Sequence, residues 1–226
     1  MGSIQKIYVR STRDDLGRYP TWPIGQRVQL GQVGHYQGRS TNFVWETNLS
    51  RLGLQVPELG PESLSEDEMY LSQDSVSYEF SAEAGEKLAK VNFDFKKRSS
   101  IVSQGYQMGQ RRLDLVELKQ QLVRGIQEGR LNWRYHWVIV TEVWLAKGFT
   151  TLISGSKASI SELSARAEAP GASFNIADIG LGVKLTAARS MAYRNVAVED
   201  TQPYFQIHRL WRNHELEVYG GKRWLF

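Results

Sequence analysis

The 226-residue sequence predicts an α+β fold, in which a twisted, mainly antiparallel sheet packs against an amphipathic helix and carries long hairpin extensions. Three observations support this. Several stretches alternate apolar and polar side chains, as half-buried strands do. The stretch 112–129 instead places Leu or Ile every three or four residues, as an amphipathic helix does. Finally, Thr150–Ser190 alternates over a long run but uses mainly Ser, Ala and Gly, whereas strands favour Val, Ile, Tyr and Phe.

Residues 1–56 are predicted to form an N-terminal β subregion. Ile4–Val9 alternates and is expected to be the first strand, and the next residues, 16–25, hold two prolines and two glycines and are expected to be an extended loop. A hairpin follows, with arms at 28–36 and 43–47. Its closely spaced glycines are assigned to the hairpin, because no helix follows them as a phosphate-binding loop would require.

The segment 57–74 separates this subregion from the rest of the chain. It carries six acidic side chains and no basic one, and two prolines and a glycine lie in its first part. Such a composition is typical of a solvated loop. We therefore expect an acidic loop at 57–74 and a core at 75–205, which together with 1–56 form a single α+β domain. A C-terminal tail follows at 206–226.

The core is expected to begin with a strand, a short helix and a returning strand. Val76–Phe80 and Val91–Phe95 alternate as strands do, while Ser81–Lys90 opens with a helix-capping residue followed by helix formers. The amphipathic helix at 112–129 is next, with Gly129 placed to end it. A strongly β stretch, WRYHWVIVTEVWLA, begins at Trp133.

Within the small-residue segment, two alternating arms flank a predicted turn at 169–172, Ala-Pro-Gly-Ala. Each arm has one apolar and one polar face and is about ten residues long, enough for a strand to cross a membrane. An ordinary solvent-facing sheet also alternates in this way, so both interpretations stay open. The membrane-face candidates are Leu163, Ala165, Ala167, Ile179, Leu181, Val183 and Leu185.

No sequence motif for catalysis is evident. The chain has no cysteine, and Ser154-Gly155-Ser156-Lys157 lacks the partner motifs of the penicillin-interacting enzymes whose S-x-x-K pattern it matches. The four histidines are too scattered for a metal motif; they are His35, His136, His208 and His214. We therefore expect no enzyme activity, no cofactor and no metal.

Basic and aromatic side chains interleave in two stretches, 130–137 and 208–212. Such mixtures suit base stacking with phosphate contacts, aromatic and basic residues at a lipid interface, or Trp packed in a core beside Arg. Core packing is the default interpretation, and nucleic acid is not expected as a partner.

The N-terminal residues lack the apolar run of a signal peptide, and no stretch reaches the roughly 20 apolar residues of a membrane helix. The opening Met-Gly-Ser fits the start of a myristoylation signal, but Lys6 stands where Ser or Thr is required. The expected location is cytoplasmic, with transfer to a membrane on activation.

A family resemblance rests on the order of elements over about 76–226. Its parts are SVSYEFSAEAGEKLAKVNFDFKKRSSIVS at 76–103, the helix at 112–128, WVIVTEVWLAKGFTTLISGSKASISELSARAE from Trp137, and a second small-residue hairpin reaching about 198. This order resembles the pore-forming domain of gasdermins, particularly the short bacterial ones. Bacterial members typically carry an N-terminal cysteine for acylation, which this chain does not have.

In that family two hairpin regions extend to form a membrane pore, and the bacterial members are held inactive by a C-terminal peptide that an associated protease removes. The resemblance implies hairpins at about 76–103 and 155–198. It places Lys96, Lys97 and Arg98 near lipid headgroups. It also implies an autoinhibitory role for the tail, with Trp224, Leu225 and Phe226 as its plug.

The resulting expectation is the precursor of a pore-forming cell-death effector in antiphage defence, released by proteolysis of its tail. Its partners would be membrane lipid after activation, an activating protease, and further copies of itself in the membrane. The alternative is a non-enzymatic binding or scaffold protein of a bacterial or phage system.

Overall fold

The computed structural model describes residues 2–36, 43–60, 66–72, 76–82, 88–166 and 184–220. The chain packs as two compact units. Unit 1 comprises 1–7, 64–108 and 146–201, and unit 2 comprises 8–63, 109–145 and 202–226. Two long strands, β8 (Ile101–Leu113) and β9 (Val138–Ser154), contribute residues to both.

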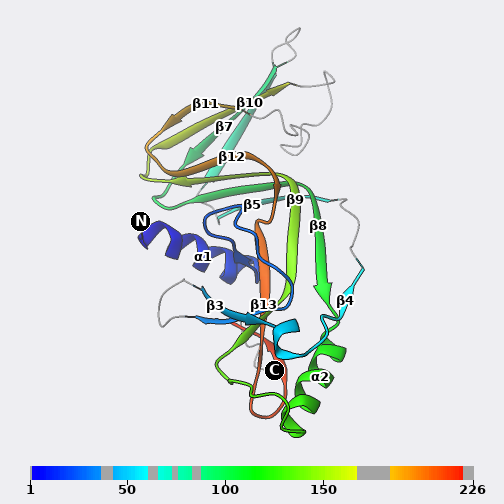
Figure 1. The fold of residues 1–226 in the computed structure, drawn as a ribbon. Coiled ribbons are helices and arrows are strands. Elements are labelled where there is room, and N and C mark those ends of the chain that lie inside the picture. Colours follow the sequence, from blue (N-terminus) through cyan, green and yellow to red (C-terminus); the bar gives the residue numbers. More distant parts are fainter. Residues whose placement is uncertain are drawn as a thin grey trace, which may run out of the picture. The chain divides into compact units, whose positions relative to one another are not determined.

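The described part of the chain is dominated by antiparallel strands, with only two α-helices (Figure 1). The predicted mixture of helix and antiparallel sheet is therefore confirmed in outline, although the sheet takes a larger share than predicted. Neither helix has the length and apolar character that would let it cross a membrane.

Part of a ten-stranded sheet lies in unit 2, where the strand order is β1-β13-β9-β2-β3. Further strands of this sheet extend it: β14 pairs with β13, β8 pairs with β9, and β4 pairs with β8. The predicted hairpin is confirmed as β2 and β3, whose connection, 37–42, lies outside the described residues. The bounds are β1 (Tyr19–Pro20), β2 (Gln32–Tyr36), β3 (Phe43–Asn48), β4 (Glu58–Leu59), β13 (Tyr204–Leu210) and β14 (Leu216–Val218).

The predicted first strand at Ile4–Val9 is wrong, because helix α1 spans Gly2–Leu16. Tyr8, Val9 and Thr12 are all buried, and their spacing of one and four residues is that of a helix face. A short apolar run cannot be assigned to strand or helix by alternation alone. The predicted N-terminal β subregion therefore begins with a helix.

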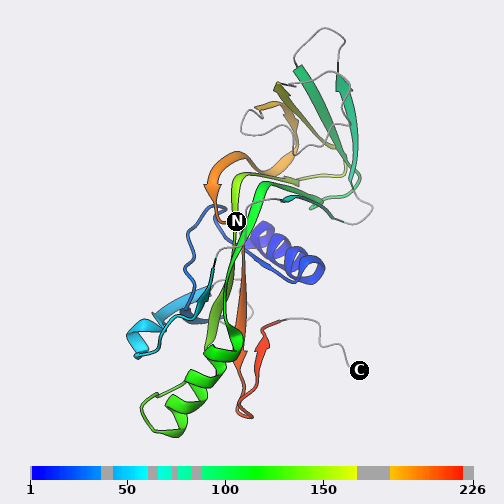
Figure 2. The same ribbon diagram turned by 90° about the vertical axis from the view of Figure 1, so that its right-hand side faces the viewer.

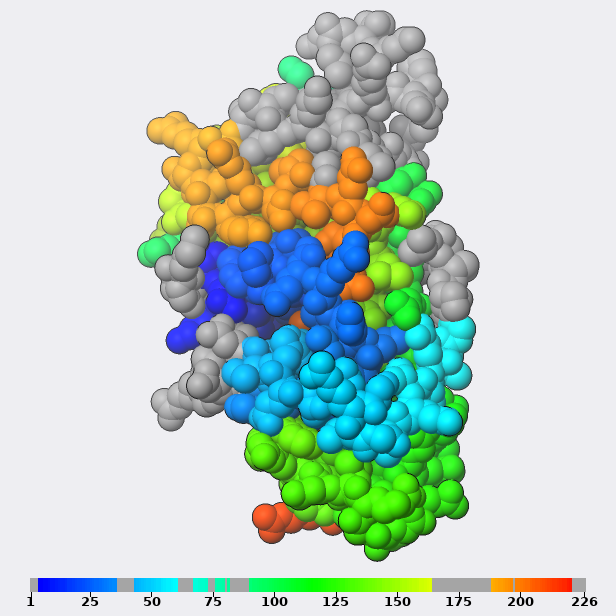
Figure 3. All heavy atoms as spheres, in the orientation of Figure 1, coloured from blue at the N-terminus to red at the C-terminus, as the bar shows by residue number. Residues whose placement is uncertain are grey.

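The predicted amphipathic helix is confirmed as α2 (Leu115–Gln127). Asp114 caps it by accepting hydrogen bonds from the amides of Val116 and Glu117, and Gly129 follows it with a φ of 70°. Leu118 and Leu122 are fully buried. In Figure 3, the residues around the 3-10 helix η1 (Ser50–Leu52), in cyan, lie directly against those of α2, in green.

In unit 1, β5 (Glu66–Leu71) pairs with β8, and β12 (Met191–Thr201) pairs with β9. The predicted acidic loop at 57–74 therefore contains two of the described strands, β4 and β5. β5 has a partner on one side only among the described strands, and charged side chains are common on such edges because they discourage pairing with other chains.

The predicted short helix at Ser81–Lys90 is also wrong in its described residues. β6 (Val76–Ala82) and β7 (Leu88–Phe95) pair as a hairpin up to Ala82 and Ala89, and 83–87 lie outside the described residues. In the described residues Ala82, Leu88 and Ala89, strand pairing overrides the helix preference of alanine and leucine.

Candidate functional site

Two hairpins lie side by side in unit 1 and form a four-stranded antiparallel sheet of order β11-β10-β7-β6 (Figures 1 and 2). The first hairpin is β6–β7, and the second is β10 (Ser159–Arg166) with β11 (Lys184–Arg189). They join through β7 and β10, which pair from Phe95 with Ser159 to Leu88 with Arg166.

One face of this sheet is buried and the other is polar. Val91, Phe93 and Phe95 of β7 are buried, whereas Lys90 and Asp94 are exposed. On β10, Leu163 is buried and belongs to the same apolar cluster as the three β7 residues. The cluster also contains Val102 of β8 and Leu152 of β9.

The small residues of β10 lie opposite phenylalanines on the buried face. Ser161 pairs with Phe93 and Ser159 pairs with Phe95, and both serines are fully buried. Small side chains across from large ones allow a layer to fill without overpacking. In the described part of the segment, the side chains are therefore small because they lie opposite large phenylalanine side chains.

The predicted turn at 169–172 does not set the register of the second hairpin. A turn there would place Leu163 opposite residue 178, whereas Leu163 pairs with Leu185. A bulge between Glu162 and Leu163 shifts the register further along the strand. The residues that connect the two strands, 167–183, lie outside the described residues.

The membrane-face candidates have different outcomes. Leu163 is 1% exposed and is part of the core of unit 1. Ala165 lies on β10 and Leu185 on β11. Four candidates lie outside the described residues: Ala167, Ile179, Leu181 and Val183.

The headgroup candidates Lys96, Lys97 and Arg98 follow β7 directly, and all three are exposed. The carbonyl of Lys97 accepts hydrogen bonds from the hydroxyls of Ser100 (2.8 Å) and Ser154 (2.7 Å), which fix this turn. The Ser154 hydroxyl is fully buried and also accepts from the amide of Ser100. Ser154 therefore has a structural role.

The plug candidates Trp224, Leu225 and Phe226 lie outside the described residues. The preceding chain is part of the sheet of unit 2, since β13 covers 204–210 and pairs with β1, β9 and β14. Tyr219 donates its amide to the carbonyl of Ile207 at 2.9 Å, and its own carbonyl accepts from the Tyr19 hydroxyl at 2.8 Å. A tail that could be removed without taking any of the described strands starts after Gly220.

The two basic and aromatic stretches meet in unit 2 around a hollow of about 760 Å³. Arg209 donates to the carbonyl of Tyr135 at 2.7 Å, which ties the stretches together. The Arg209 guanidinium lies 4.3 Å from the Trp211 ring centre, and that of Arg212 lies 5.9 Å from the Tyr135 ring centre. The hollow is lined by three arginines and several aromatic side chains, together with one carboxylate: Trp133, Arg134, Tyr135, His136, Arg209, Trp211, Arg212, Asn213 and Glu217.

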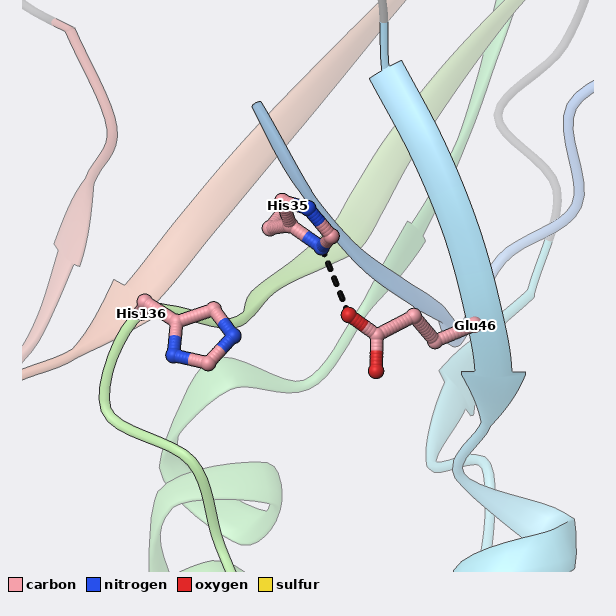
Figure 4. A group of neighbouring side chains, drawn as sticks. All are labelled: His35, Glu46 and His136. Carbon is pink, nitrogen blue, oxygen red and sulfur yellow. Dashed lines mark hydrogen bonds and ion pairs between the residues drawn. The ribbon is translucent and has the colours of Figure 1, made fainter. Parts of the chain in front are cut away.

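A second cluster in unit 2 contains two histidines and a carboxylate. His35 lies on β2, Glu46 on β3, and His136 in a turn just before β9. Their candidate ligand atoms all lie within 4.8 Å of one another. Figure 4 shows His136 with a ring nitrogen turned toward the Glu46 carboxylate, while His35 Nδ1 lies 2.6 Å from Glu46 Oε1.

The backbone brings these residues together because β2 pairs with β3 on one side and β9 on the other. A bulge leaves Glu46 as the extra residue of β3, since Val33 pairs with Thr47 and Gly34 with Trp45. Bulges change the direction of a side chain and are frequent near functional sites. A Cβ on Gly34 would overlap the carbonyl of Val44, so this close approach of the two strands requires glycine.

His35 and Arg134 both contact the Glu46 carboxylate. Arg134 Nη1 lies 3.2 Å from Glu46 Oε2. Partial burial alone would raise the pKa of Glu46, but the net shift is downward. The pKa is lowered by the nearby Trp137 indole, by the hydrogen bond and charge of His35, and by the charge of Arg134. The Trp137 indole nitrogen is close to the carboxylate but does not form a regular hydrogen bond with it. Glu46 therefore stays ionised at neutral pH.

Sequence reasoning missed this cluster, because its positions 35, 46 and 136 form no local motif. The other histidines lie elsewhere: His208 is buried in β13 and His214 lies in the turn between β13 and β14. A clue was available in the predicted hairpin, which places residues 35 and 46 near each other on paired strands. The position of His136 depends on the pairing of β2 with β9, which no sequence pattern indicates.

Comparison with known proteins gives no relative: no family model matches the chain, and no curated protein matches its sequence.

Proposed function

We propose that this protein is the precursor of a membrane pore, and that the two hairpins of unit 1 are the segments that enter the membrane. The observation that carries the proposal is the β11-β10-β7-β6 sheet, in which two hairpins already lie side by side in antiparallel pairing. A membrane-lining sheet needs this arrangement, with one face for lipid and one for water.

The alternation of side chains fits both environments. The face that carries Phe93, Phe95 and Leu163 packs on the core of unit 1 before activation and would meet lipid afterwards. The opposite face carries Lys90, Asp94 and other polar groups, and would line the aqueous passage. The exposed Lys96, Lys97 and Arg98 lie at one end of the first hairpin, where cations would meet anionic headgroups.

The proposal includes proteolytic release of the tail. The cleavage must leave the strands of the sheet intact. A chain ending near residue 205 would lose most of β13, with the buried Ile207 and Leu210. A chain ending at Gly220 keeps β13, β14 and the contacts of Tyr219. The activated form is therefore tested with the 220-residue chain.

Release of a trapped dye from vesicles of anionic lipid is the first test. We expect the chain ending at Gly220 to release dye and the full chain to release much less. Circular dichroism and thermal unfolding show whether both chains are folded. Folded protein with no dye release from either chain, at any ratio of protein to lipid, would overturn the proposal.

The second test is ion selectivity in planar bilayers. Lys90 is exposed on the polar face of β7, and its reversal in Lys90→Glu should shift the reversal potential toward cation selectivity. Arg51→Glu is the matched control, since Arg51 is an exposed cation on η1 in unit 2. Equal selectivity for both variants would show that β7 does not line the passage.

A second candidate function is that of a non-enzymatic binding protein, and the basic, aromatic hollow of unit 2 favours it. Guanidinium groups beside aromatic rings suit an anionic partner. Under this alternative, Arg209→Ala and Arg212→Ala would weaken a soluble complex seen by analytical ultracentrifugation, and neither chain would release dye from vesicles.

A further inference from the structure

We propose that His35, Glu46 and His136 form a binding site for a divalent first-row transition-metal ion, of which Zn²⁺ is the representative. The inference is independent of the pore proposal, since all three residues belong to unit 2. It rests on the donor set, on the geometry of the cluster, and on the backbone features that create it.

The donor set is two imidazoles and one carboxylate. This combination suits Zn²⁺, Co²⁺, Ni²⁺ and Cu²⁺, whereas Ca²⁺ and Mg²⁺ prefer sites made of oxygen ligands. Three protein ligands leave further coordination positions for water or a partner's ligand. The side chains of His35 and Glu46 keep 29% and 23% of their exposure, so an ion can enter from solvent.

The geometry requires only small side-chain movements. Ligand atoms about 2.0–2.1 Å from a tetrahedral ion lie about 3.3 Å apart. The present atoms are all within 4.8 Å of one another, and the closest two, His35 Nδ1 and Glu46 Oε1, are 2.6 Å apart. Binding would open the His35–Glu46 hydrogen bond slightly and draw in His136, which lies in a turn at the protein surface.

A purely structural ion pair explains less of the arrangement. Glu46 already pairs with His35 and Arg134, and neither contact requires His136. Yet His136 approaches with its ring centre 5.5 Å from that of His35, in an edge-on arrangement. The bulge at Glu46 and the close approach of the strands at Gly34 direct the Glu46 carboxylate toward the two imidazoles.

Replacing Arg134 distinguishes a metal site from a purely structural ion-pair network. Its guanidinium holds Glu46 Oε2 at 3.2 Å and adds positive charge beside the site, so it competes with a bound cation. Arg134→Gln should therefore tighten metal binding by about two- to fivefold, which is the scale of an exposed ion pair. If the cluster were only an ion-pair network, removing Arg134 would change stability and create no metal affinity.

The experiment uses the full chain without a histidine tag and titrates it with ZnCl₂ by calorimetry. We expect one equivalent to bind. The same chain with CoCl₂ should develop visible absorption bands from nitrogen and oxygen ligands. His136→Ala and Glu46→Gln should each weaken binding by at least about tenfold while the circular dichroism spectrum stays unchanged.

His214→Asn is the matched control, because it removes a histidine outside the cluster. Asn tolerates the positive φ of 64° at that position, so the fold should be kept. This control should bind Zn²⁺ as the parent chain does. Absence of one-equivalent binding in the parent, or equal affinity in His136→Ala, would overturn the proposal.

Discussion

His208 lies within β13 with 4% of its area exposed, and its Nδ1 is 2.7 Å from the Thr141 hydroxyl. Burial lowers the pKa of His208 to about 4, from an ordinary value of 6.5. Between about pH 4 and 6.5, this imidazole is therefore neutral in the folded chain and protonated in the unfolded chain.

The stability of the folded chain should therefore depend on pH. Between about pH 6.5 and 4 the unfolded state binds a proton that the folded state does not, so stability should fall as the pH falls through this window. The loss should approach about 3 kcal/mol below pH 4, at roughly 1.4 kcal/mol for each unit of pKa difference. Urea unfolding from pH 7 to 4 measures it. His208→Gln should flatten this part of the profile, and an unchanged slope would contradict the prediction.

Gly34 permits the close approach of β2 and β3 next to the His35–Glu46–His136 cluster. Gly34→Ala would force the Cβ against the carbonyl of Val44, so we expect a loss of about 1–3 kcal/mol in stability. Gly60→Ala is the matched control, because a Cβ there has nothing within 4 Å. Thermal unfolding of both variants measures the effect. Similar unfolding temperatures for the two would show that the strands can separate at little cost.

At the scale of elements, the buried face of β10 contains two serines with different surroundings. The Ser159 hydroxyl donates to the carbonyl of Ser190 at 2.8 Å, whereas the Ser161 hydroxyl has no hydrogen-bond partner among the described residues. A buried hydroxyl without a partner costs about 1–3 kcal/mol, and one with a partner contributes about 1 kcal/mol.

The two alanine variants should therefore shift stability in opposite directions. Ser161→Ala should raise the free energy of unfolding by about 1 kcal/mol, and Ser159→Ala should lower it by about the same amount. Chemical denaturation measures both, and each variant serves as the control for the other. A loss in both would mean that Ser161 also finds a partner.

How far each element could be predicted depended on its length and on what it packs against. The stripe that includes Leu118 and Leu122 spans several turns, so α2 was predictable, whereas α1 offered only a short apolar run. β5 was missed because its charges suit both an edge strand and a loop. The His35–Glu46–His136 cluster could not be predicted, because it depends on pairing between strands far apart in sequence.

At the scale of the whole molecule, the chain passes between the units several times, so neither unit is one continuous stretch of sequence. The C-terminal part belongs to unit 2 through β13, whose Ile207 and Leu210 are fully buried. Shortening the chain should therefore have very different effects on either side of this strand.

The chain ending at Gly220 should unfold within a few degrees of the full chain, because β13, β14 and the Tyr219 contacts remain. The chain ending at residue 205 should lose cooperative unfolding, since several buried side chains disappear with most of β13. Circular dichroism melting curves compare the two. A cooperative transition in the shorter chain would show that β13 is dispensable.

The four-stranded sheet of unit 1 has an even number of strands, all antiparallel, so its edge strands β6 and β11 run in opposite directions. In the described part of this sheet, each has a partner on one side only. A second copy set alongside in the same orientation would present its β6 antiparallel to the first copy's β11. Identical copies could thus extend one unbroken antiparallel pattern, which an odd number of strands would interrupt with a parallel pair at each junction. Such a head-to-tail contact repeats without a twofold axis, and the rotation at each step determines how many copies complete a ring.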